Sequence, residues 1–256
     1  MRLLAISDYH GKTDVLPLLA NTLDELKPDS VVFTGDIVKG YARGDEWLAA
    51  EKEGREPRIG EEILAEEEED LSFYNDFFSF FEHKKIPLFA IPGNMDAPVE
   101  RYSQHVVRKY LHSTVVQLVH DAVLEFQGYR FVGFGGQLVS SNAEAFFIRR
   151  YLEKEAIEAM QIRLESESSG KLIFLTHHPP VGNVGNDNGV HKGSRAVNQL
   201  IKMFKPTYAF CGHAHKARAI ERINETTVIN PGALKDYHYA LIDTTAKIES
   251  LRKLDL

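Results

Sequence analysis

Short apolar runs alternate with segments of helical periodicity along much of this chain. Five runs have the length of a buried strand, and each stops at a small or polar residue; they cover residues 3–6, 31–34, 88–91, 172–176 and 208–211. Residues 14–27 and 193–205 place apolar side chains at spacings of three and four, and each segment stops before a proline. Strands that alternate with amphipathic helices predict an α/β fold in which helices cover a sheet.

A second set of strand-like runs lies further along the chain. These runs cover residues 115–119, 122–126 and 129–134, with a tight turn expected at Gln127-Gly128. Residues 219–251 contain more such runs, broken by turn sequences such as Asn230-Pro231-Gly232. The 256 residues show no internal repeat, and we expect residues 1–256 to form a single domain.

Two segments exceed what a minimal core of strands and helices needs. Residues 44–82 predict a helical insertion, in which the acidic run at 66–70 is expected to be a solvated surface. Six aromatic residues that follow this run have the spacing of a buried helix face: Phe73, Tyr74, Phe77, Phe78, Phe80 and Phe81. Residues 142–167 predict one long helix. Either segment could cover a site or contact a second subunit, so an oligomer is compatible with the sequence.

The composition is that of a soluble globular protein, with 43% hydrophobic and 26% charged residues. No run approaches the roughly 18 apolar residues of a spanning helix, and the N-terminal run is too short for a signal peptide. Cys211 has no second cysteine to pair with and is expected to be a buried thiol. We expect a cytoplasmic protein without membrane contacts. The net charge of −7 gives no general attraction to nucleic acid, although a local basic groove is compatible with it.

Side chains that can bind metal ions stand at or near the ends of the five strand-like runs. The patches are Ser7-Asp8-Tyr9-His10, Gly35-Asp36, Gly93-Asn94-Met95-Asp96, Thr176-His177-His178 and Gly212-His213-Ala214-His215. Each patch alone also fits an ordinary turn or cap. Ligands of such sheets gather beyond the carboxyl ends of the strands, so we expect these side chains to meet there. Together they suit Mn²⁺, Fe or Zn²⁺, and two ions about 3.5–4 Å apart can clamp a phosphoryl group.

In this order, the five patches resemble the calcineurin-like metallophosphoesterases, and the resemblance covers residues 7–232. It implies a four-layer α/β/β/α sandwich and a centre of two divalent ions, with Mn²⁺ favoured and Fe, Zn²⁺ or Ni²⁺ compatible. One ion would be bound by Asp8, His10 and His215. The other would be bound by Asn94, His177 and His213, and Asp36 would bridge the two.

The activity that this resemblance implies is hydrolysis of a small phosphoester. A hydroxide between the two ions would attack phosphorus, and Asn94, His177 and His213 would serve catalysis as well as metal binding. Phosphomonoesterases of the family usually carry a histidine after the Gly-Asn pair, which protonates the leaving oxygen. Here that position is Met95, whose thioether has no proton to donate. Lys39 also stands where the protein-phosphatase branch has the aspartate that orients this histidine.

Because both members of the acid pair are replaced, we expect a phosphodiesterase. Small prokaryotic members with cysteine in place of this histidine resemble the pattern and are associated with phosphodiester hydrolysis. One alternative is a phosphomonoesterase or nucleotide pyrophosphohydrolase that uses His191, in the glycine-rich loop after His177, or water as the acid. Another is a non-catalytic scaffold of the same fold that binds proteins.

Several other residues near the patches have simpler interpretations. His178 is expected to bond nearby backbone, and Asp96 to cap a helix that begins near Pro98. Lys39 fits a solvated lysine as well as a substrate contact. The remaining histidines without local support are expected at the surface or in core packing: His83, His105, His112 and His120.

Overall fold

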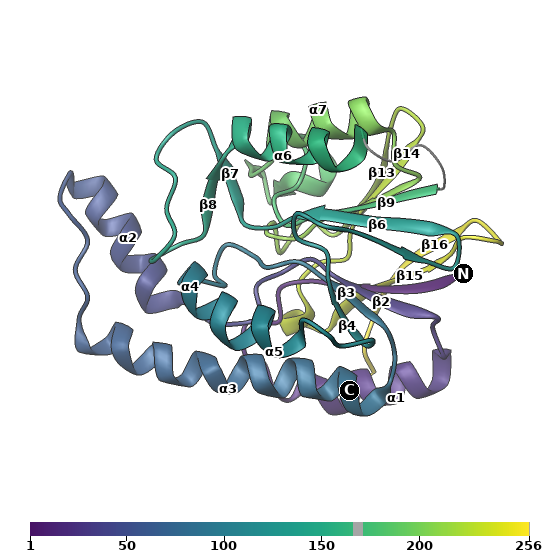
Figure 1. The fold of residues 1–256 in the computed structure, drawn as a ribbon, viewed down its shortest axis with the longest axis horizontal. Helices are drawn as coiled ribbons and strands as arrows, with labels where there is room; N and C mark the ends of the chain where they lie inside the picture. Colours follow the sequence, from purple (N-terminus) through teal and green to yellow (C-terminus); the bar gives the residue numbers. More distant parts are fainter. Residues whose placement is uncertain (166–170, 256) are drawn as a thin grey trace.

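Two six-stranded mixed sheets form the centre of the molecule in this computed structural model, which describes residues 1–165 and 171–255 (Figure 1). The first sheet has the strand order β16 (Ile248–Lys253), β15 (His238–Asp243), β1 (Arg2–Ile6), β2 (Ser30–Phe33), β3 (Leu88–Ala90) and β4 (Val116–Leu118). The second has the order β13 (Ala219–Ile223), β14 (Thr226–Asn230), β12 (Tyr208–Phe210), β9 (Lys171–Thr176), β6 (Tyr129–Phe134) and β5 (Val123–Phe126).

Helices cover the outer face of each sheet, which completes four layers (Figure 1). The first sheet is covered by α1 (Val15–Leu26) and α3 (Glu61–Lys84), and the second by α6 (Glu153–Glu165) and α7 (Arg195–Phe204). The predicted α/β fold is therefore confirmed, and so is the four-layer α/β/β/α sandwich that the resemblance implies.

The alternation of side chains along β1 explains why the sheets stack. Leu4 and Ile6 point outward and pack with Phe77 of α3, whereas Leu3 and Ala5 point inward toward the second sheet. Phe89 of β3 stacks on Phe131 of β6 with ring centroids 3.8 Å apart. Strands covered on both faces are mostly apolar, which is why β1 from Leu3 to Ile6 and β3 carry no polar residue.

Shorter elements complete the chain. In sequence order they are α2 (Tyr41–Glu53), α4 (Val99–Tyr102), the π-helix η1 (Ser103–Val107), α5 (Arg108–Tyr110), β7 (Gln137–Val139), β8 (Arg150–Leu152), η2 (Asn183–Gly185), β10 (Asn186–Asp187), β11 (Val190–His191) and η3 (Leu234–Asp236). Within the two described stretches, no helix is long and apolar enough to cross a bilayer.

The prediction of one helix over residues 142–167 is wrong for residues 142–152. The helix α6 begins at Glu153, and the residues before it form an irregular loop and the strand β8. In that loop Phe147 and Ile148 are buried against Ile63 of α3, so tertiary packing decides the backbone here. A Glu144 carboxylate oxygen accepts the N–H groups of the residues that follow it, which satisfies them without a helix. Residues 166 and 167 lie outside the described residues.

The segment 44–82 is mostly helical, in α2 and α3, and its aromatic face is buried as predicted. The prediction of a solvated acidic run is wrong for two of its members. Asp70 is fully buried and lies 2.7 Å from Nη2 of Arg43, and Glu67 is buried and lies 2.5 Å from Nη2 of Arg101. These carboxylates bury because each has a guanidinium partner. That the segment is an insertion stays a prediction.

Candidate metal centre

Five turns bring the seven predicted ligands together between the two sheets. Asp8 and Asp36 follow the parallel neighbours β1 and β2, and Asn94 follows β3. On the second sheet His177 follows β9, and the histidines of the Gly-His-Ala-His patch follow the parallel neighbour β12. The carboxyl ends of parallel strands meet at one edge of each sheet, so the stacked sheets place all five turns at a common end.

Four of these residues form a compact group with metal-binding atoms all within 4.8 Å of one another: Asp8, His10, Asp36 and His215. Nε2 of His215 lies 3.2 Å from Oδ1 of Asp8 and 3.1 Å from Nε2 of His10. The first three side chains are almost fully buried, whereas His215 is partly open. Two carboxylates and two imidazoles in one cluster are a donor set that divalent transition metals accept.

The other three residues surround the amide oxygen of Asn94. This Oδ1 atom lies 2.8 Å from Nε2 of His177 and 2.7 Å from Nδ1 of His213. The Asn94 amide nitrogen donates to the sulfur of Met95 at 3.0 Å, which keeps the oxygen turned toward the imidazoles.

Asp36 stands between the two groups. Its Oδ1 accepts the backbone N–H of Met95 at 2.7 Å. Its Oδ2 lies 3.7 Å from Nε2 of His10 and 3.4 Å from Nε2 of His177. One oxygen of a single carboxylate therefore faces imidazoles from both groups.

The hydrogen bonds of the imidazoles fit a cation at this place. Nδ1 of His177 donates to the carbonyl of Thr34 at 2.7 Å, and Nδ1 of His10 donates to the carbonyl of Val38 at 3.1 Å. When these rings are neutral, the Nε2 atom of each carries a lone pair, and that of His177 points at Oδ1 of Asn94, which is also an acceptor. Two acceptors this close need a proton or a cation between them, and a bound metal ion supplies the cation.

The charges of the centre point the same way. Burial alone would lower the pKa of His177, but the charge and hydrogen bond of Asp36 raise it to about 9. Burial would raise the pKa of Asp36, yet His177 and His10 hold it at about 2. Burial lowers the pKa of His10 to about 4, so this ring is neutral near pH 7 and free to bind a metal ion. The site therefore attracts positive charge while its carboxylates stay ionised.

The backbone of the centre is held in an uncommon conformation. Asp8, His10, Asp36 and His213 all have positive φ, between 48° and 65°. For residues other than glycine this region costs free energy and persists only when neighbours enforce it.

Asp96 supplies much of that enforcement. Its Oδ2 accepts the N–H groups of Asp36 and Gly93 at 3.0 and 2.7 Å, and its Oδ1 those of Ile37 and Val38 at 2.9 and 3.3 Å. The prediction of a helix cap is therefore wrong, because α4 has no side-chain cap and the carboxylate instead joins two turns of the centre.

The glycines of the two motifs allow these turns to touch. A Cβ atom on Gly35 would lie 2.3 Å from the backbone nitrogen of Gly93, and Gly35 also has φ near 103°. A Cβ atom on Gly93 would collide with the carboxylate of Asp36. Only glycine at these two positions allows the Gly-Asp turn and the Gly-Asn turn to pack against each other so closely.

A family model described as "Metallophosphoesterase, calcineurin superfamily" matches residues 1–253, which is nearly the whole chain. The chain belongs to this superfamily. This membership agrees with the two mixed sheets and with the cluster of carboxylates and imidazoles at their common end.

Relatives of this metallophosphoesterase match it over almost their full lengths. An uncharacterized protein of Methanocaldococcus jannaschii, MJ1162, is 28% identical over 93% of this chain and 91% of its own. One crystal structure superposes over 99% of both chains with a TM-score of 0.89 and 25% identity. The crystal structure of TT1561 of Thermus thermophilus also covers 99% of both chains, with a TM-score of 0.78 and 21% identity. The last of these matches supports the fold alone.

Met95 lies beside the centre, where its side chain is half-buried. Its terminal methyl packs against α2, because Cβ atoms added to Gly40 and Gly44 would lie 3.1 and 2.9 Å from it. Lys39 has turned to α3, where its ammonium lies 2.8 Å from Glu69 and over the ring of Phe73. The thioether of Met95 thus packs against Gly40 and Gly44, and the ammonium of Lys39 pairs with Glu69.

The two histidines considered beyond the ligands differ in their surroundings. His178 bonds backbone as expected, since its Nδ1 accepts the N–H of Leu138 at 3.1 Å. His191 is exposed on the hairpin of β10 and β11, and across the described residues no hydrogen bond or ion pair joins its side chain to the seven ligands. Its role as an acid stays a prediction.

Two arginines that border the centre were missed by the sequence interpretation. Arg43 donates to the carbonyl oxygens of Met95 and Ala97, and the backbone N–H of Arg149 donates to the carbonyl of Asn94 at 2.8 Å. Neither arginine follows a strand or belongs to a motif. No local pattern signals them, because their burial depends on contacts between distant segments.

Proposed function

We propose that this metallophosphoesterase hydrolyses phosphodiesters with two divalent metal ions, Mn²⁺ being the favoured ion. One ion is assigned to Asp8, His10 and His215, the other to Asn94, His177 and His213, and Asp36 to both. The observation that carries the proposal is a full set of donors beside Met95, a residue that cannot protonate a leaving group.

When bound, two such ions supply a nucleophile from water and offset the charge on phosphoryl oxygens. The residues of the chain then position that chemistry. We assign the contact with the oxygens of a substrate to Asn94 and to His213, which is half-buried and lies 2.7 Å from the amide oxygen of Asn94. Asp96 keeps the turns of Asp36 and Asn94 together, so the donors need little rearrangement when a substrate binds.

We expect neither His178 nor His191 to replace the missing acid. Burial lowers the pKa of His178 to about 4, so its ring is neutral, and its Nδ1 already accepts a backbone N–H. His191 is exposed and separate. Because an acid of this kind contributes typically 10²–10⁴-fold, substrates with poor leaving groups lose most without it. Phosphodiesters whose leaving group departs as a stabilised anion lose least.

The test compares substrates after metal removal and reconstitution. Protein stripped with a chelator is loaded with Mn²⁺, Fe²⁺, Zn²⁺ or Ni²⁺ and assayed with bis(4-nitrophenyl) phosphate, 4-nitrophenyl phosphate and an alkyl phosphomonoester. We expect no turnover without metal, restoration by Mn²⁺ among others, and higher kcat/KM for the diester. Activity that survives complete metal removal would contradict the metal centre, and preference for the monoesters would contradict the phosphodiesterase.

Two substitutions at one position isolate the leaving-group argument. Met95→His restores a proton donor, and we expect it to raise activity on the alkyl monoester more than on the aryl diester. Met95→Leu is the matched control, since it keeps the apolar volume and adds no donor. If Met95→His gains nothing on either kind of monoester, the absence of the acid does not set the substrate range.

A further inference from the structure

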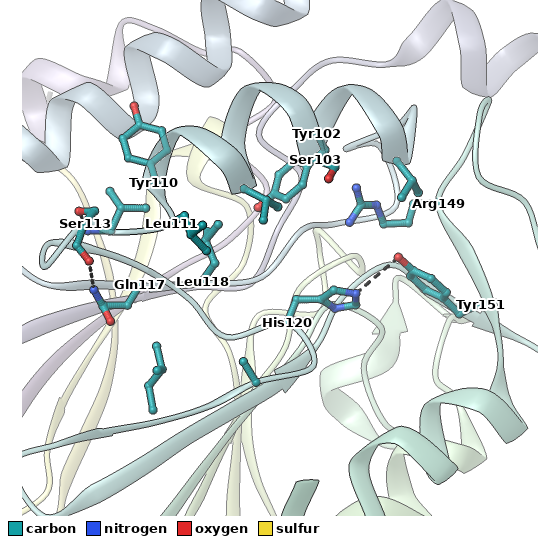
Figure 2. A pocket seen from close by; sticks show the side chains of 15 residues that line it. Tyr102, Ser103, Tyr110, Leu111, Ser113, Gln117, Leu118, His120, Arg149 and Tyr151 are labelled. Carbon is teal, nitrogen blue, oxygen red and sulfur yellow. Dashed lines mark hydrogen bonds between the residues drawn. The ribbon is translucent and has the colours of Figure 1, made fainter. Parts of the chain in front are cut away.

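A cavity of about 500 Å³ lies apart from the metal ligands, between β4, β5 and the helical segment from α4 to α5 (Figure 2). Its volume falls within the range of small-molecule sites. Aliphatic side chains form one part of its wall: Val99, Val107, Leu111, Val116, Leu118 and Leu124. Part of that wall is the π-helix η1, an element that is rare and frequently found at functional sites.

The inner end of this cavity carries a buried positive charge. Arg149 is 2% exposed, and its guanidinium points into the cavity and lies 4.6 Å over the ring of Tyr102 (Figure 2). Its Nε and Nη2 atoms have no hydrogen-bond partner among the described residues, and neither has the buried hydroxyl of Tyr102. A buried charge without hydrogen bonds is costly, so groups like these normally have a partner.

Asp96 does not provide that partner. It feels the positive charge of Arg149, but its two oxygens already accept four backbone N–H groups. Among the residues that line the cavity there is no aspartate or glutamate. The positive charge of Arg149 is therefore left without a hydrogen-bonded anion in the described chain.

His120 and Tyr151 extend the donor character of this end (Figure 2). Nδ1 of His120 accepts the N–H of Gly135 at 2.9 Å, so the ring proton is on Nε2, 3.5 Å from the hydroxyl of Tyr151. Burial, aided by the charge of Arg149, lowers the pKa of His120 to about 3, so the ring is neutral. With Tyr151 accepting that proton, its own O–H is free to donate.

The outer part has the opposite character. Leu111 is 65% exposed and Val107 is 36% exposed, both on the helical segment that borders the cavity. A ligand that matches both ends carries a negative group at one end and an apolar body at the other.

We propose that this cavity binds a small amphipathic acid, with its anionic group on Arg149 and Tyr102 and its apolar body along the aliphatic wall. A guanidinium binds a carboxylate or a phosphate with paired hydrogen bonds, and its Nε and Nη2 atoms lie on one edge of the group. The site is separate from the metal ligands, although the backbone N–H of Arg149 bonds the carbonyl of Asn94.

Titration calorimetry of the whole protein tests this with decanoate as the probe, at about pH 8, where the acid is ionised. Decanol has the same body without the charge, acetate has the charge without the body, and decyl phosphate has the other anionic group. We expect saturable binding of decanoate, and affinity at least about ten-fold weaker for decanol and acetate. A tighter fit of decyl phosphate would assign the natural ligand to the phosphate class within the same proposal.

Three variants locate the site. Arg149→Gln should weaken decanoate binding at least about ten-fold. Arg150→Gln is the matched control, since this neighbour points to Gln137 and Glu51 and should bind as the wild type does. Ser103→Phe places a large ring in the same cavity and should also weaken decanoate binding at least about ten-fold, which keeps the test valid if Arg149→Gln does not fold.

Three results would overturn the proposal. They are no saturable binding of decanoate or decyl phosphate, equal affinity for decanoate and decanol, and wild-type binding in folded Arg149→Gln or Ser103→Phe. The readout is binding alone, so loss of phosphodiesterase activity for other reasons does not affect it.

Discussion

Two buried arginines contact the same turn, residues 93–97, and they are satisfied in different ways. Arg43 is fully buried; its Nη2 bonds Asp70 at 2.7 Å and the carbonyl of Met95 at 3.3 Å, and its Nη1 donates to the carbonyl of Ala97. Only its Nε is without a hydrogen bond in the described chain, and a carboxylate oxygen of Glu66 lies 3.8 Å from it. Arg149 contacts the turn through its backbone, and two of its guanidinium nitrogens have no such partner.

The difference separates a structural charge from a charge available to a ligand. The guanidinium of Arg43 bonds Asp70 of α3 and two carbonyl oxygens of the turn, and so it connects α2, α3 and the turn. No binding role follows from this charge. The charge of Arg149 does little for folding that a neutral side chain could not do, and it faces a cavity. Burial alone does not distinguish the two residues; their partners do.

The largest expected effect is a difference in the free energy of unfolding between variants of Arg43 and Arg149. Arg43→Met leaves the carboxylate of Asp70 buried without its partner, which should lower the free energy of unfolding by about 3–5 kcal/mol. Arg149→Met removes a charge that lacks hydrogen bonds, so the free energy of unfolding should stay unchanged or rise. Urea denaturation at about pH 8 measures both. Burial raises the pKa of Asp70 to about 7 against the opposing charge of Arg43, so at that pH the carboxyl is ionised.

Equal losses in the two variants would contradict the distinction. Arg149 would then be part of the structural network, and its missing hydrogen bonds would not indicate a ligand. A loss confined to Arg149→Met would reverse the assignment of the two arginines.

The same comparison shows what the sequence could predict. The seven candidate ligands were predicted because each stands at or near the end of a strand-like run and the five patches occur in a recognised order. The first cause is local, since a turn at a strand end depends on a few neighbouring residues, whereas the second is a resemblance that covers residues 7–232. The strands and the aromatic face of α3 were predicted for the first, local reason.

Partners between distant segments could not be read in this way. The pairing of Arg43 with Asp70 joins two helices, and Asp96 joins the turn after β3 to the turn after β2. The acidic run of α3 was predicted to be solvated because nothing in its own sequence indicates the guanidinium groups of Arg43 and Arg101 that pair with it. The loop before α6 had helical spacing, but burial of Phe147 and Ile148 determined its backbone.

A smaller effect tests the partner of Arg43 through pH. Asp70 has its pKa raised by burial from 3.8 to about 7, so between these values the folded protein holds a proton that the unfolded chain has lost. The free energy of unfolding therefore falls as pH rises through this window, by up to about 1.4 kcal/mol per pH unit from this group. In Asp70→Asn this contribution disappears, and the decline between about pH 5 and 7 should be shallower.

Urea unfolding at several pH values measures that slope. Glu68→Gln is the matched control, because Glu68 is an exposed neighbour on the same helix and its replacement should leave the profile parallel to the wild type. Parallel profiles for Asp70→Asn as well would mean that Asp70 is ionised throughout the window, and that its pair with Arg43 persists down to pH 5.

The smallest effect concerns the apolar contact between the turn at residues 93–97 and α2. In this contact Met95 packs against Gly44, the neighbour of Arg43 in the sequence. A Cβ atom at Gly44 would lie 2.9 Å from the terminal methyl of Met95, which is flexible enough to move. Alanine in place of a helical glycine normally raises stability by about 0.5–1 kcal/mol. In Gly44→Ala we expect less than this gain, because the methyl of Met95 has to leave its place.

A double-mutant cycle separates the two contributions. In Met95→Ala, where the methyl is absent, Gly44→Ala should give the full gain of about 0.5–1 kcal/mol. Urea denaturation measures the gain in the free energy of unfolding in both backgrounds. Equal gains would show that the methyl of Met95 does not depend on the missing Cβ atom at Gly44. The hydrogen bonds of Arg43 would then be the stronger attachment of the turn to α2, and Met95→His should leave the free energy of unfolding unchanged.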